Sequence, residues 1–191
     1  MNIFVLHDDP VLAAQDQCDK HVVKMIVESA QMLSTVHRML DGTITMRPSK
    51  SGKRTLKYYE LHDDREDVLY KAVHHNHPCT VWSREACMNY DWHYEHFIAL
   101  CDEYTYRYGK IHASDTKLRE LLKTKPKMIP HKNRMTKFKL AMGSNPECVV
   151  GGLGGTNVVE SYRNFYHTKQ ERFKMDWTKR KTPEWFTHAS I

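Results

Sequence analysis

The sequence lacks long hydrophobic runs, paired-cysteine motifs and internal repeats, and each absence excludes a class of protein. No apolar run approaches the ~18 residues that a membrane helix needs. The apolar patch at residues 3–6 is too short for the hydrophobic core of a signal peptide, because His7 and two aspartates follow it at once. We therefore expect a cytoplasmic protein.

Cysteine is scarce and unpaired. The five cysteines are an odd number and form no CxxC pair, which is typical of free thiols in a reducing compartment. We predict no disulfide and no zinc knuckle. HExxH and comparable metal motifs are also missing, so no motif indicates a metal enzyme.

Alternating strand patterns and heptads are absent, whereas apolar residues recur at helical spacing in several segments. Asp9 before Pro10 predicts a helix start, and the helical period continues to Leu40, as one helix or as two broken near Asp19. An unusually aromatic helix is expected over residues 80–108, ending at Gly109. Shorter helices are expected at 62–73, 115–123 and 157–169.

The length of 191 residues suits one domain with a sizeable core and is too short for two domains and a linker. Residues 42–57 and 124–147 combine Lys and Arg with turn-forming residues, so we expect flexible basic loops there. The glycines within 151–155 predict a flexible turn. The expected fold is mainly α: a single compact domain, residues 1–191, of several helices with long irregular basic segments.

The net charge of +6 is unevenly distributed along the chain. Residues 1–104 carry 11 Lys and Arg against 16 Asp and Glu, whereas residues 105–191 carry 18 against 7. A basic half beside an acidic half is what a polyanion-binding face would look like. This asymmetry favours a nucleic acid or a nucleotide as the partner.

Charged residues interrupt the longest apolar helix. His21, Lys24 and Glu28 fall along one stripe at 3.6 residues per turn. The ordinary interpretation is a solvated face with a Lys24–Glu28 pair, worth ~0.3 kcal/mol. The flanking valines, Met25 and Ile26 argue that part of the stripe approaches the core. Burial would shift the pKa values of such groups towards those useful in acid–base catalysis.

At these residues the sequence resembles a known family. The run Asp19-Lys20-His21-Val22-Val23, with Glu28 seven residues after the histidine, is similar to the N-terminal pattern of the phage pyrimidine-dimer DNA glycosylases of the endonuclease V type. Residues 90–108 with Gly109 resemble that family's second long helix, and the basic, tryptophan-rich C-terminus resembles its tail. The chain also looks like a set of uncharacterised small phage proteins.

This resemblance implies an all-α DNA N-glycosylase with AP-lyase activity on a damaged or modified base. Such an enzyme flips a base out of the duplex and attacks the sugar C1′ with its N-terminal α-amine, while a carboxylate assists. Carried over by position, Glu28 is the catalytic carboxylate and His21 an orienting or DNA-contacting residue. Asn2 is too large for ordinary removal of Met, so Met1 would supply the amine. Lys24 is the fourth catalytic candidate.

Aromatic residues interleaved with cations suit a flipped base or nucleotide. At helical spacing aromatic residues are more often core, so we select the polar neighbours as candidates for DNA binding. These candidates are Lys20, Arg84, Asn89, Lys132, Arg134, Lys137, Arg163 and Lys169.

Histidines cluster in two places, at residues 74–77 and at His93 and His96, and could form a two-segment metal site. With 13 histidines in the chain, accidental clustering is the better explanation, and we expect no metal and no organic cofactor. Two other functions stay open: a transferase or hydrolase acting on a modified nucleotide or base, and a non-enzymatic protein that binds nucleic acid or a host protein.

Overall fold

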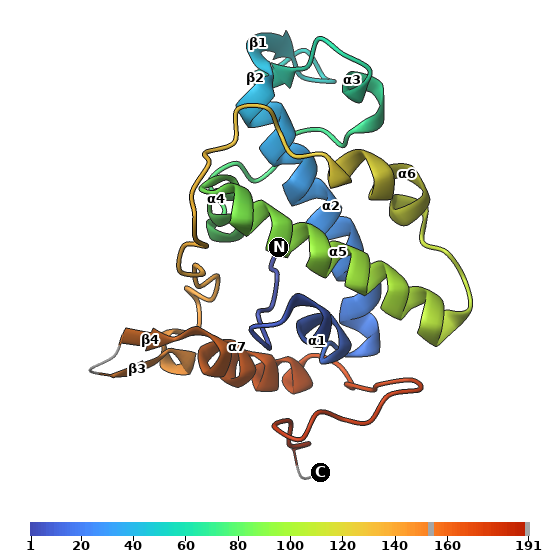
Figure 1. Ribbon diagram of the computed structural model, residues 1–191, viewed down its shortest axis with the longest axis vertical. Helices are drawn as coiled ribbons and strands as arrows, with labels where there is room; N and C mark the ends of the chain where they lie inside the picture. The colour runs from blue at the N-terminus through green and yellow to red at the C-terminus, as the bar shows by residue number, and fades with distance from the viewer. Residues whose placement is uncertain (153–154, 190–191) are drawn as a thin grey trace.

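The computed structural model describes residues 1–152 and 155–189 (Figure 1). Within them, seven α-helices and two small two-stranded sheets occur, which confirms the mainly α prediction. None of these helices has the length and apolar character that crossing a membrane requires. The elements are α1 (Pro10–Gln15), α2 (Asp19–Asp41), β1 (Thr43–Pro48), β2 (Thr55–Glu60), α3 (Arg65–Val68), α4 (Pro78–Arg84), α5 (Cys87–Tyr108), α6 (Ala113–Lys123), β3 (Val150–Gly152), β4 (Gly155–Asn157) and α7 (Val158–His167), with 3-10 turns at Pro146–Cys148 and Thr168–Glu171.

The first helical segment is two helices. The Asp9 carboxylate accepts hydrogen bonds from the backbone N–H groups of Val11 and Leu12, so α1 begins where predicted. The extended backbone of Cys18 then separates α1 from α2. Gly42 follows α2 for a steric reason, because a Cβ there would lie 2.4 Å from the Arg38 carbonyl oxygen.

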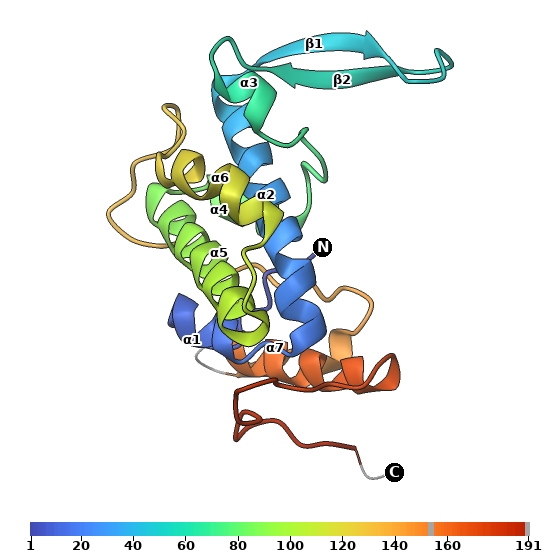
Figure 2. The ribbon, with the colours of Figure 1, turned by 90° about the vertical axis from the view of Figure 1, so that its right-hand side faces the viewer.

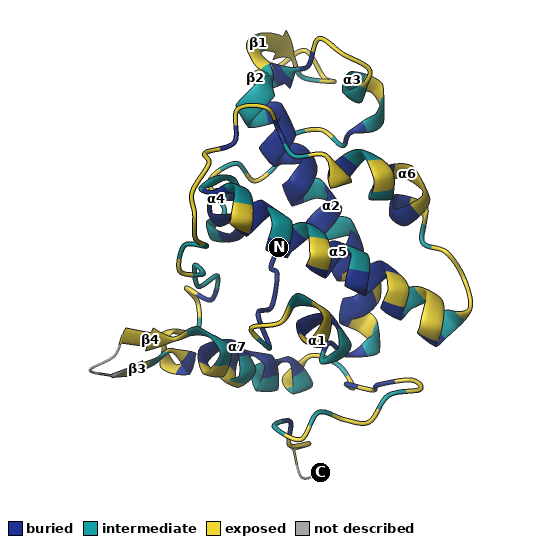
Figure 3. Cartoon of the chain, viewed as in Figure 1, coloured by how far each residue is buried: buried dark blue, intermediate teal, exposed yellow. Residues whose placement is uncertain are grey.

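Helices α2 and α5 cross to form the centre of the molecule, with α1, α4 and α6 packed around them (Figure 1). Their facing sides are buried, while the outer sides of α5 and α6 are exposed (Figure 3). The segment at residues 3–6 forms neither helix nor strand, turns at Phe4 (φ 54°) and is buried against this core. It therefore holds the N-terminus close to α2.

The aromatic helix predicted over residues 80–108 is broken near its start. Ala86 is extended, and α4 and α5 lie on either side of it. The predicted end is confirmed, because Gly109 adopts a left-handed conformation with φ 66°. Of the helix predicted at 62–73, only the four residues of α3 are helical. The two remaining predicted helices are confirmed as α6 and α7, the latter capped by the Asn157 side chain.

The prediction of a basic loop at residues 42–57 is wrong, because the structure has a hairpin there. These residues lie mostly in an antiparallel hairpin of β1 and β2, in which Met46 pairs with Lys57 and Arg47 with Leu56. β1 does alternate polar and apolar residues, with Ile44 and Met46 on one side, but over only six residues, and Leu56 of β2 faces the other side. Residues 124–145 contain no helix or strand. The tip of the predicted glycine turn, 153–154, lies outside the described residues, between β3 and β4.

Candidate active site at the N-terminus

The buried N-terminal segment brings the chain's first amine to a carboxylate of α2. The Met1 nitrogen lies 3.7 Å from Oε2 of Glu28, and the Asn2 backbone N–H donates to the same oxygen at 2.8 Å. Lys24, one helical turn earlier, places Nζ 3.3 Å from Oε1 of Glu28. The Glu28 side chain is 12% exposed, so it reaches solvent while three nitrogen groups surround it.

A pocket of about 210 Å³ opens over this contact. Its walls come from three parts of the chain: the N-terminal segment, the first half of α2, and the region from α7 to the following 3-10 turn. The lining residues include Met1, Asn2, Phe4, His21, Lys24, Glu28, Phe165, Lys169, Arg172 and Phe173. Three basic side chains and the amine face one carboxylate there, a charge balance that favours an anionic ligand.

His21 is buried against aromatic rings behind the pocket. Its ring stacks on Phe4 with centroids 4.7 Å apart, and its Nδ1 shares a hydrogen bond of 2.8 Å with the Tyr166 hydroxyl. Burial, assisted by the positive charges of Lys24 and Lys169, lowers the pKa of His21 to about 3. The imidazole is therefore neutral near pH 7 and holds Phe4 and Tyr166 in place.

Lys169 is the buried cation of the pocket. Only 8% of the residue is exposed, and Nζ lies 3.3 Å from the centroid of the Phe165 ring. Burial lowers the pKa of this ammonium below its ordinary value. Lys20 is exposed nearby, with Nζ 4.9 Å from the Phe173 ring centroid. Lys169 thus lines the same pocket as Glu28, and Lys20 lies beside Phe173, another lining residue.

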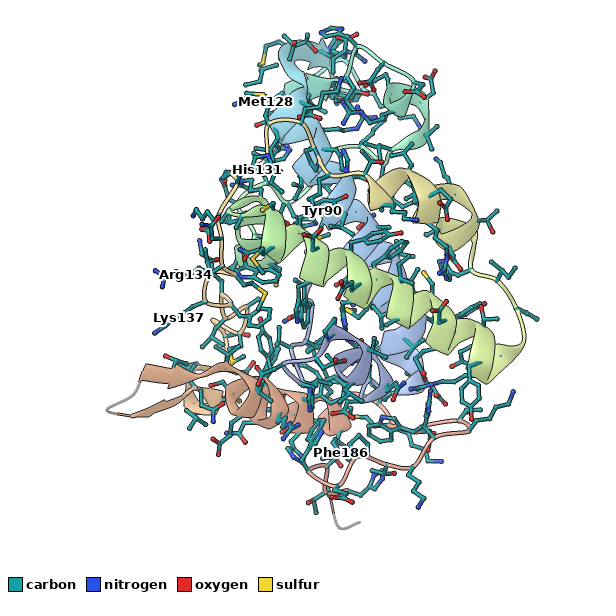
Figure 4. All side chains as sticks on the ribbon, viewed as in Figure 1. Tyr90, Met128, His131, Arg134, Lys137 and Phe186 are labelled. Atoms are coloured by element: carbon teal, nitrogen blue, oxygen red, sulfur yellow. The ribbon has the colours of Figure 1, made fainter. Side chains whose placement is uncertain are left out.

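The other predicted DNA-binding residues lie elsewhere. Arg84 donates to the His75 carbonyl at 2.6 Å. Arg163 donates to the Leu6 carbonyl at 2.9 Å and stands over the Trp185 ring, beside a separate polar pocket of about 560 Å³. Three exposed cations, two of them labelled in Figure 4, lie on the loop between α6 and the first 3-10 turn: Lys132, Arg134 and Lys137.

The prediction that Asn89 binds DNA is wrong. It is fully buried on α5, its amide donates to the Trp82 carbonyl and to the Thr136 hydroxyl, each at 2.7 Å, and its oxygen accepts from the Thr136 N–H at 2.9 Å. The two contacts with Thr136 hold the loop onto the core, and the contact with Trp82 joins α5 to α4. Asn89 therefore has no surface from which to reach a base edge.

The buried histidines of α5 also contact other residues of the core. His93 shares a 2.7 Å hydrogen bond with Ser83, and His96 lies 2.9 Å from the Pro10 carbonyl oxygen. Within residues 1–152 and 155–189, no group of three or more His, Cys, Asp or Glu side chains could hold a metal ion. All five cysteines carry free thiols.

Sequence reasoning missed Asn2, Arg172 and Phe173. The first two stand at opposite ends of the chain, and no local pattern marks residues that meet only after folding. For Arg172 and Phe173 the only available signal is composition, namely an aromatic residue between basic ones near the C-terminus.

A family model described as pyrimidine dimer DNA glycosylase matches residues 1–117. The match covers Met1, His21, Lys24 and Glu28, whereas the wall of the pocket contributed by α7 and the residues after it lies beyond the match. Nothing among curated proteins or solved structures matches the chain. Since the family model spans more than half of the sequence, the chain belongs to the pyrimidine dimer DNA glycosylase family.

Proposed function

We propose that this protein is a DNA N-glycosylase with AP-lyase activity, in which the α-amine of Met1 is the nucleophile and Glu28 the assisting carboxylate. The observation that carries this proposal is the 3.7 Å separation of that amine from Glu28 at the floor of a cationic pocket. Family membership supports DNA as the substrate. The family's description also names the lesion to be tested first, a pyrimidine dimer.

The reaction follows from the two groups. The unprotonated amine attacks C1′ of the damaged nucleotide, the bond from C1′ to the base breaks, and the base leaves with a proton. Opening of the sugar ring gives an iminium between C1′ and the Met1 nitrogen. Glu28 then takes a proton from C2′, and the bond from C3′ to the phosphate oxygen breaks by β-elimination. Water finally releases the enzyme from the sugar fragment.

The remaining walls of the pocket suit the substrate. Lys24, Lys169 and Arg172 present positive charge to the phosphates that flank the reacting sugar. Phe173, which is half-buried, offers its ring to an unstacked base or to the sugar. Because C1′ lies inside an intact duplex, the damaged nucleotide or its partner must first leave the base stack.

Borohydride trapping tests the nucleophile. Wild-type protein incubated with a duplex containing an abasic site, and separately with one containing a pyrimidine dimer, should form a reducible covalent adduct. Peptide mapping should place this adduct on residue 1. A variant extended by two residues before Met1 keeps every side chain but moves the amine away from Glu28, so it should lose the adduct.

Two results would contradict the assignment. An adduct on Lys24 or Lys169, or an extended variant as active as wild type, would exclude the Met1 amine as the nucleophile. Base release without any adduct would instead indicate a simple glycosylase without lyase activity.

A further inference from the structure

The β1–β2 hairpin projects from the body of the molecule. Figure 2 shows it extending beyond α2 on the side where the N-terminus lies, away from α5. Six residues per strand at about 3.3 Å each give the hairpin a reach of about 20 Å. Apart from Ser49, which is half-buried, its tip at residues 49–54 is exposed. It contributes little to the core.

The hairpin carries a concentrated positive charge. Residues 43–60 contain five basic side chains and one carboxylate, Glu60. Of the five, only Arg47 forms an ion pair in the described part of the chain, with Glu60 at 2.9 Å near the base of the hairpin. Of the unpaired ones, Lys50, Lys53 and Arg54 lie in the tip, and Lys57 lies within β2. This basic projection stands out because residues 1–104 are acidic overall.

The base of the hairpin is anchored firmly. Arg38, which is 1% exposed, donates to the Tyr59 carbonyl at 3.1 Å and to the Glu66 carboxylate at 2.6 Å. The same carboxylate accepts from the Tyr58 hydroxyl at 2.6 Å and from the Leu61 N–H at 2.9 Å. A buried, fully used guanidinium thus fixes the direction in which the hairpin points.

Exposed apolar residues do not form a docking face for a protein. Ile44 and Met46, 52% and 63% exposed, lie on one side of the hairpin, whereas Leu56, 52% exposed, lies on the other. No single side is therefore apolar, while positive charge covers the tip. Charge complementarity accordingly selects a polyanion as the occupant, and a two-stranded ribbon has the width that a groove of duplex DNA admits.

We propose that the β1–β2 hairpin is an arm that grips the duplex away from the reacting nucleotide, with Lys50, Lys53 and Arg54 on backbone phosphates. This inference rests on the proposed function for the identity of the partner as duplex DNA. The hairpin and the N-terminus, which lines the pocket, lie on the same side of α2 (Figure 2), an arrangement that suits contact of both with one duplex. Phosphate contacts of this kind position DNA without reading its sequence.

The test compares two triple variants by fluorescence anisotropy with an undamaged duplex of about 25 base pairs. The tip variant is Lys50→Gln, Lys53→Gln and Arg54→Gln. The control is Lys110→Gln, Lys117→Gln and Lys123→Gln, which removes the same charge from exposed positions at the α5–α6 side. The tip variant should bind at least tenfold more weakly at about 100 mM salt, and its salt slope should fall by about 2 to 3. The control should stay within about threefold of wild type.

Single-turnover cleavage of lesion-bearing DNA at saturating protein separates the arm from the chemistry. The tip variant should then react within about twofold of the wild-type rate, because its pocket is intact. Equal weakening of DNA binding in both variants, or unchanged DNA binding in the tip variant, would overturn the proposal. A tip variant that loses self-association but keeps its affinity for DNA would also overturn it. If the wild-type protein binds DNA through the hairpin tip but does not process lesions, the proposed role of the hairpin is supported and the proposed function is contradicted.

Discussion

Glu28 contacts three nitrogen groups at once, from Met1, Asn2 and Lys24. If Glu28 only formed a surface ion pair with Lys24, it would have no contact with the N-terminal segment and would not line a pocket. The N–H of Asn2 and the amine of Met1 both approach Oε2, which leaves Oε1 to Lys24. The carboxylate is therefore held at the amine while one oxygen remains near solvent, an arrangement suited to passing a proton.

We predict that Glu28→Gln abolishes most of the activity without unfolding the protein. Glutamine keeps the shape and can still accept from Asn2, but it cannot take a proton or stabilise a cation. Activity on abasic or dimer-containing DNA should fall about 100-fold or more, while the free energy of unfolding changes by no more than about 1 kcal/mol. Strand cleavage and thermal unfolding, measured in parallel, check this.

Glu95→Gln is the matched control, because Glu95 is exposed on α5 and should retain full activity. A Glu28→Gln protein that is both active and as stable as wild type would remove Glu28 from the proposed mechanism.

At the scale of elements, Arg38 joins α2 to the hairpin and to α3. Besides its contacts to Tyr59 and Glu66, its guanidinium donates to the carbonyls of Leu69 at 3.1 Å and Tyr70 at 2.8 Å. We predict that Arg38→Lys costs about 3 kcal/mol or more, because one ammonium cannot replace a buried fork of donors. Amide hydrogen exchange should quicken first across β1 and β2.

Arg47→Lys provides the comparison, since Arg47 also pairs with a glutamate on the hairpin but is 45% exposed. Its unfolding free energy should change by less than about 0.5 kcal/mol. Similar losses in the two variants would show that burial of the Arg38 guanidinium does not anchor the hairpin.

The loop of residues 131–137 is the second basic element outside the pocket. Trp82 donates to the Thr136 carbonyl at 3.2 Å, and together with Asn89 it fixes the loop while leaving the cations exposed. We predict that replacing Lys132, Arg134 and Lys137 with Ala weakens DNA binding and lowers the salt slope by about 2 to 3, with an unchanged thermal midpoint. Salt titrations and melting curves measure both quantities.

Asn89→Ala should do the reverse, lowering stability by about 1–3 kcal/mol because it leaves buried backbone groups unpaired, with DNA affinity retained in the folded protein. A loop variant that binds as tightly as wild type at low salt would exclude this loop from the DNA interface.

At the scale of the whole molecule, burial makes stability depend on pH. Desolvation lowers the pKa of the four buried histidines furthest: His21 and His93 to about 3, and His37 and His96 to about 4. As pH falls below the ordinary value of about 6.5, the unfolded chain takes up these protons and the folded chain does not. Stability is therefore fully present above about pH 6.5 and is lost as pH falls towards 4.

We predict a loss of about 1 kcal/mol per buried histidine for each pH unit between about 6 and about 5. Denaturant unfolding across this range measures it. His93→Asn should make the dependence shallower by one proton, whereas His62→Gln, at an exposed position, should not alter it. A stability that is constant from pH 7 to 5 would contradict the buried, neutral state of these rings.

One contiguous hydrophobic cluster runs from Ile3 to Phe186, and we propose on this basis that the chain folds as a single domain. Calorimetry should then show one two-state transition. Two separable transitions would divide the chain, and the C-terminal wall of the pocket would belong to a separate unit.

The sequence by itself determined the features that arise from short-range interactions. The Asp9 cap, the end of α5 at Gly109 and the Asn157 cap follow from groups within a few residues of one another. The charged stripe of α2 follows from the helical period. The family also follows from sequence alone, because its matched pattern lies in one continuous region, residues 1–117.

Only the tertiary structure decided which of these residues meet. Met1 reaches Glu28 because the buried N-terminal segment packs against the helical core, and Lys169 joins them from the other end of the chain. Asn89 and Lys169 are both polar residues on helical or turn segments, yet one is taken up by the core and the other lines the pocket. Burial and contact at such sequence separations depend on how whole elements pack, which no local pattern encodes.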